Sequence, residues 1–165
     1  MFEKMRRFKQ ELEQNEIERI LKDNTSGVLS VIDENGYPYS VPLSFVYYNG
    51  SIYFHSAKSG HKINAINNCK KSTFCIIDKD DVKPEKFTTF YKSVIAFGNV
   101  EIVNDDEETF FAIKNISKKY YPDHNDELQA EIEKSKYKFL IIKFNIEYIT
   151  GKQSIELLNA GSQNN

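Results

Sequence analysis

Two Asn-Gly pairs constrain the fold of this chain more than any other feature of its sequence. Asn35 followed by Gly36, and Asn49 followed by Gly50, each supply the positive φ angles that a two-residue hairpin turn requires. Strand-forming residues flank both pairs, over 28–32, 37–48 and 51–55. Two hairpins in direct succession predict an antiparallel meander of three strands.

Three more strands are expected after this meander, over 72–78, 88–103 and 139–150. One helix after Gly60 and another over 104–120 connect them. Six strands with short turns predict a mainly β fold, a closed or nearly closed six-stranded antiparallel barrel with helices. Such a barrel is too narrow to hold a large ligand, so a cofactor has to bind at its mouth or between two subunits.

The remaining segments are assigned from simpler signals. Helical spacing of apolar residues predicts a short helix over 15–23, and Gly98 predicts a bulge in a long strand. The sequence also predicts a charged loop over 79–86, a surface His124, a short helix over 126–135 and a disordered tail over 160–165. We expect one domain over 1–165, with 1–13 as an N-terminal extension.

Composition narrows the classes of partner. The net charge of -2 gives no basic field for nucleic acid, and no apolar run is long enough to span a membrane. Cys69 and Cys75 are not in a metal-ligand spacing, and we expect two reduced thiols and no metal site. With no apolar leader after Met1, the expected compartment is the cytoplasm.

Residues 55–66 (HSAKSGHKINAI) read as a strand end, a glycine turn and the start of a helix. Exposed N–H groups and the helix dipole at such an N-terminus attract an anion. Lys62, in the first turn, opposes the dipole, and a bound phosphate would remove that conflict. A solvated lysine-rich turn capped by Ser59 explains the same residues equally well at this point.

Pro38 and Pro42 interrupt the strand predicted over 37–48. Proline cannot donate to a β-ladder, so each marks an edge, a bulge or a place where a ligand replaces the neighbouring strand.

Five segments in this order carry a family resemblance: 35–44 (NGYPYSVPLS), 52–57 (IYFHSA), 60–62 (GHK), 91–98 (YKSVIAFG) and 149–152 (ITGK). Together they resemble the FMN-binding split barrels related to pyridoxamine 5'-phosphate oxidase, and most closely their nitroimidazole-resistance branch. The resemblance implies a split barrel, a homodimer and FMN in a groove at the subunit interface.

The resemblance also implies roles for individual residues. The turn with Gly60, His61 and Lys62 would hold the FMN phosphate. The edge of the isoalloxazine would be contacted by Pro42, Leu43 and Ser44, and the ribityl chain and ring by His55, Ser56 and Ala57. The partner subunit would contribute Tyr91 and Ser93, and Lys152 would be a further flavin contact.

One departure limits the substrate. Oxidases of pyridoxamine phosphate carry an arginine-rich set for a second phosphate, but Arg6, Arg7 and Arg19 are the only arginines here and precede the barrel. We therefore expect a flavin-dependent oxidoreductase that reduces a small planar acceptor, such as a nitroaromatic or a quinone. His55 is the candidate proton donor, because an imidazole titrates near neutral pH.

Two other functions stay open at this stage. A barrel of this kind can bind flavin, deazaflavin or haem as a carrier or sensor without turnover, since fold does not fix function. The tyrosine-rich surface could instead serve a ligand-free interaction module.

Overall fold

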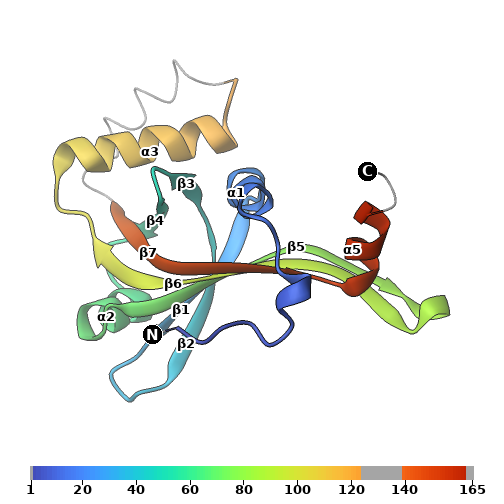
Figure 1. Cartoon of the computed structure of the whole chain (residues 1–165). Helices are drawn as coiled ribbons and strands as arrows, with labels where there is room; N and C mark the ends of the chain where they lie inside the picture. The colour runs from blue at the N-terminus through green and yellow to red at the C-terminus, as the bar shows by residue number, and fades with distance from the viewer. Residues whose placement is uncertain (1, 124–138, 163–165) are drawn as a thin grey trace.

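The computed structural model describes residues 2–123 and 139–162 (Figure 1). Its strands form a seven-stranded antiparallel sheet with the order β2-β1-β5-β6-β7-β4-β3. They are β1 (Ser26–Ile32), β2 (Pro38–Ser44), β3 (Val46–Tyr48), β4 (Ser51–Ala57), β5 (Lys71–Lys83), β6 (Thr88–Ile102) and β7 (Phe139–Gln153). The predicted mainly β split barrel is confirmed.

Helices pack around the sheet at several places (Figure 1). They are η1 (Phe8–Gln10), α1 (Gln14–Asp23), α2 (His61–Asn68), η2 (Pro84–Lys86), α3 (Asp106–Tyr120) and α5 (Ile155–Ser162). Ile20 and Leu21 of α1 and Ile63 and Ile66 of α2 enter one shared core with the strands. Figure 1 shows α3 lying across β3 and β4, on the outside of the sheet. No helix within the described ranges is both long and apolar enough to cross a membrane.

The predicted strand over 37–48 is two strands, because the chain breaks at Phe45. The Tyr120 hydroxyl of α3 takes the place of a strand partner there. The hydroxyl oxygen accepts a hydrogen bond from the Phe45 amide at 2.9 Å. It also lies 2.9 Å from the Phe45 carbonyl oxygen and contacts the Thr25 carbonyl oxygen. Backbone groups freed by the break are therefore satisfied by one side chain, a contact that sequence periodicity cannot show.

The predicted loop over 79–86 was mostly wrong. β5 continues to Lys83 and pairs with β6 up to Thr88, so only Pro84–Lys86 turns. This hairpin projects beyond the barrel beside α5 (Figure 1). Phe87, 98% exposed and with a φ of 50°, closes its tip. The segment 79–83 was predicted as a loop because its residues are mostly charged. In the structure this part of the strand pair has no buried face, so it lacks the alternating apolar residues that indicate a strand.

Other local predictions can now be compared with the structure. The bulge at Gly98 is confirmed: the register shifts there, and a Cβ would lie 2.0 Å from the Asn145 carbonyl oxygen. Asp105 caps α3 by accepting a hydrogen bond from the Glu108 amide at 2.7 Å. The tail expected from 160 was wrong in part, since α5 runs to Ser162. The expectations for His124 and 126–135 lie outside the described residues.

We expect Tyr120→Phe to lower the free energy of unfolding by about 1–3 kcal/mol, because the buried backbone groups at Phe45 lose their partner. Urea denaturation measures the change. Tyr121→Phe is the matched control, since the Tyr121 side chain is exposed. Equal effects of the two substitutions would contradict this account of the strand break.

Candidate functional site

The N-terminus of α2 forms the anion-binding part of the candidate site. Gly60, with a φ of 128°, is its N-cap, and no side chain caps the helix. The Gly60 carbonyl accepts hydrogen bonds from the Ile63 and Asn64 amides, so the His61 and Lys62 amides precede the first intrahelical bond. Burial lowers the pKa of the half-buried Lys62 ammonium. An anion here would offset the cost of that buried charge.

His61 is held by the turn between β1 and β2. Its ring stacks on Tyr39 at a centroid distance of 4.3 Å, and Nε2 lies 3.4 Å from Asp33 Oδ2. Asp33 Oδ1 accepts hydrogen bonds from the backbone amides of Tyr37 and Asn35, both at 2.9 Å. The pKa of Asp33 lies below its ordinary value, mainly because the Tyr37 amide donates to its carboxylate. The Asn35 amide and His61 lower this pKa further.

Asp33 and Tyr39 were not among the predicted site residues. The signal for Asp33 was present in the sequence, because an Asp two residues before Asn-Gly commonly bonds the backbone of its own turn. Nothing local points to the stacking of Tyr39 on a helix that begins 22 residues later, since that contact needs the folded barrel.

His55 lies on the outer face of β4, close to the α2 turn. Its ring meets Phe139 edge-on at 5.0 Å. Burial, and to a lesser degree the charge of Lys62, lowers the pKa of His55 below its ordinary value. The role of His55 as proton donor stays a prediction.

Alternation along the strands decides which predicted residues can offer side chains to an outer site. Pro42, Ser44, His55 and Ala57 are exposed on the outside of the barrel. Ser56 is only 4% exposed and its hydroxyl donates to the Ala57 carbonyl at 3.0 Å. Leu43 packs against the core in the same way, so these two residues can contribute backbone groups only.

β2 provides a free backbone edge beside this turn. It is the terminal strand in the sheet of the described residues, paired with β1, and it approaches β4. Tyr39, against α2, and Ser44 are separated by about 16 Å along the strand. A molecule with a phosphate at one end and a flat ring with amide-like edges at the other fits this arrangement. The donors at α2 and the open strand edge therefore suit the phosphate and the ring of a flavin nucleotide.

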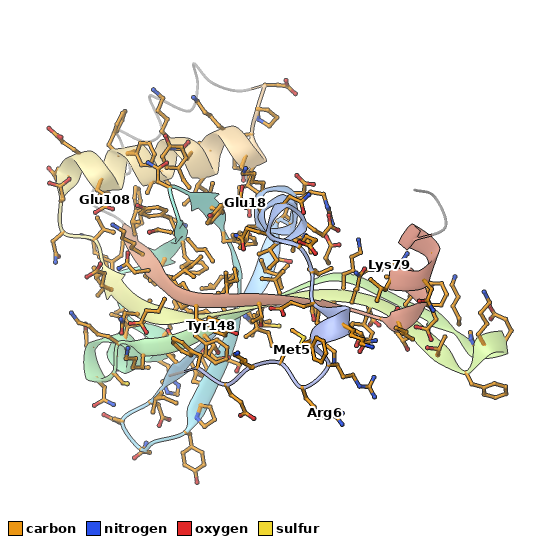
Figure 2. All side chains as sticks on the ribbon, viewed as in Figure 1. Met5, Arg6, Glu18, Lys79, Glu108 and Tyr148 are labelled. Carbon is orange, nitrogen blue, oxygen red and sulfur yellow. The ribbon has the colours of Figure 1, made fainter. Side chains whose placement is uncertain are left out.

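The remaining predicted residues form a second group. Ser93 of β6 pairs with Lys152 of β7, and Lys152 Nζ lies 5.6 Å from the centroid of the Tyr91 ring. A groove of about 260 Å³ contains Ser93 and Lys152, and its other wall is the N-terminal segment with Glu3 and Met5. Figure 2 shows Met5 and Tyr148 close beneath the sheet, with Arg6 turned away from it.

The two groups lie far apart within one chain. Ile141 is opposite His55 on β7, and Lys152 is eleven residues further along that strand, a path of about 36 Å. Ser44 and Ser93 are separated by β1 and β5, about 14 Å across the sheet. One copy of the chain therefore brings together the α2 group but not the predicted residues on β6 and β7.

A sequence profile described as pyridoxamine 5'-phosphate oxidase matches residues 13–153. The chain belongs to this family. A protein from Bacteroides thetaiotaomicron assigned to 5-nitroimidazole antibiotic resistance has 22% identity and a TM-score of 0.72, covering 87% of this chain and 86% of that one. No curated protein matches the chain.

Two further solved structures share the fold at low identity. An FAD-binding protein from Mesorhizobium loti has 21% identity and a TM-score of 0.60, covering 87% of this chain and 96% of that one. An FAD and haem binding protein from Mycobacterium smegmatis has 16% identity and a TM-score of 0.76, with coverage of 88% and 74%.

We expect the pKa of His55 to lie below 6.5 and to rise in Lys62→Met without returning fully, because burial is the larger cause. Titration of the imidazole Cε1–H signal by NMR measures it, with His55→Gln for assignment. Lys58→Met is the matched control, since Lys58 is exposed in the same turn. An unchanged pKa in Lys62→Met would show that the two side chains do not interact.

Proposed function

We propose that the protein is an FMN-binding flavoprotein that reduces a small planar acceptor, such as a nitroaromatic or a quinone. The observation that carries the proposal is the uncapped N-terminus of α2 with Lys62, placed beside the free edge of β2. Membership of the pyridoxamine 5'-phosphate oxidase family supports it. A cytoplasmic location is part of the same proposal.

Bound FMN would supply the redox chemistry, and the protein would bind and orient it. Lys62 and the α2 amides hold the phosphate, with His61 fixed against Tyr39 and Asp33. Backbone groups of Pro42, Leu43 and Ser44, on the edge strand β2, would contact the ring edge. His55 and Ala57, exposed on β4, would border the ring and ribityl chain, and Ser56 would contribute backbone groups only.

The proposal includes a homodimer with a flavin at each of two equivalent sites. Tyr91, Ser93 and Lys152 are half-buried residues of β6 and β7, far from Lys62 in the same chain. A second copy can bring its own Tyr91, Ser93 and Lys152 to the first copy's α2, which a single copy cannot do. Each site is therefore completed by residues from both chains.

The purified protein should be yellow or should bind added FMN, with the flavin absorption bleaching on reduction. We expect Lys62→Ala to weaken FMN binding at least about tenfold, since a charge-assisted hydrogen bond contributes roughly 1.5–3 kcal/mol. Fluorescence titration with FMN measures the affinity, and Lys58→Ala is the control. A colourless protein that ignores FMN would refute the proposal.

The shared site has its own test. Neither Lys62→Ala nor a Ser93→Leu variant should bind FMN tightly alone, because each lacks one half of every site. Unfolding and refolding them together should restore tight binding at one of the two sites in each mixed dimer, since the intact halves then meet. No restoration would contradict a site built from two chains.

Haem is the second candidate ligand, favoured by the exposed ring of His55 on β4. The M. smegmatis protein of the same fold is described as binding both FAD and haem. Absorption spectra after addition of each ligand distinguish the two, because a Soret band that is lost in His55→Gln identifies haem. Such a protein would be a carrier or sensor and need not turn over.

A further inference from the structure

A second groove lies on the N-terminal segment, away from the α2 turn. It has a volume of about 370 Å³, within the range of small-molecule sites, and is lined by Arg6, Arg7, Phe8, Lys9, Gln10 and Ile155. It is next to the β7 end of the sheet, because Glu11 pairs with Lys152 and the Leu12 amide bonds the Gly151 carbonyl.

The groove has an uncompensated positive charge. Two of the chain's three arginines line it, together with Lys9, although the whole chain has a net charge of -2. Arg19, the third arginine, is engaged by Glu16, Asp23 and Asp78. Within residues 2–123 and 139–162, by contrast, Arg6, Arg7 and Lys9 form no ion pair, and no carboxylate lines the groove. Guanidinium groups in this state suit phosphate oxygens.

The same groove offers an aromatic surface. Phe8 is 68% exposed, and the partly exposed Ile155 lies on the wall with it. Gln10 also lines the groove but is only 5% exposed, and its Oε1 is closed to solvent. The groups open to a ligand are therefore the Phe8 ring and the cationic side chains.

We propose that this groove binds a nucleoside phosphate. The phosphates would pair with Arg6 and Arg7, and the base would stack on Phe8. The volume fits one such molecule, and the aromatic and cationic groups match its base and its phosphates. None of the groove residues belongs to the α2 turn, so ADP binding and FMN binding can be tested separately.

The experiment is a calorimetric titration of ADP into the full chain saturated with FMN. We expect saturable binding of one ADP per chain. Adenosine and inorganic pyrophosphate should each bind at least tenfold more weakly, because each offers only part of the contacts. The double variant Arg6→Ala/Arg7→Ala should lose at least tenfold in affinity for ADP, and Phe8→Ala a similar amount.

Two variants separate this role from a structural one. Lys4→Ala, an exposed cation of the same segment outside the groove, should change ADP affinity less than twofold. Gln10→Leu should also change ADP affinity less than twofold, because the Gln10 Oε1 is closed to solvent.

Three results would overturn the proposal. They are absence of ADP binding, pyrophosphate binding as tight as that of ADP, and loss of ADP binding when FMN is added. The second would reduce the groove to a general anion surface, and the third would place ADP at the α2 turn. If the chain binds no FMN, the titration without FMN still tests the groove, so the two proposals can fail separately.

Discussion

The filled interior of the barrel is the constraint on which the rest of the structure depends. Four phenylalanine rings, Phe45, Phe54, Phe74 and Phe144, are fully buried, and Phe74 meets Phe45 and Phe54 edge-on at 5.0 and 5.1 Å. Each such side chain removed from water stabilises the fold by roughly 1.5–3 kcal/mol. Among the described residues these rings occupy the barrel core, so the candidate binding groups lie on outer faces, strand edges and helix ends.

Because the interior is packed, each strand has one set of side chains that fills the core and another set that faces outward. On β4, Ile52 and Phe54 fill the core while His55 and Ala57 face outward next to α2. On β6, Val94 and Ala96 point inward and Ser93 points outward. Core packing therefore fixes the outer residues without using their functional groups. The same separation makes mutation of the outer residues a clean probe, because little apolar area is lost with them.

The long strands β6 and β7 determine why the candidate flavin site is divided. They continue well past the barrel, and their far ends carry Tyr91, Ser93 and Lys152. The N-terminal segment runs along this face, from Phe2, which stacks on Tyr148 at 4.8 Å, to Glu11, which pairs with Lys152. The nucleoside phosphate groove lies on the same segment. A chain with this shape has one binding region at α2 and another at the ends of β6 and β7, which a second copy could join.

The sequence by itself determined the hairpins at the two Asn-Gly pairs, the helix after Gly60, the bulge at Gly98 and the family. The hairpins, the helix and the bulge depend on φ angles or periodicity within a few residues, so local sequence is enough for them. The family came from the resemblance of five segments in a fixed order. Only the tertiary structure decided the break at Phe45 and the extension of β5 to Lys83. It also decided the contacts of Asp33 and Tyr39 with the His61 ring. It also turned Ser56 inward and put Lys62 beside His55. These depend on partners distant in sequence, whose positions follow from how the sheet closes around its core.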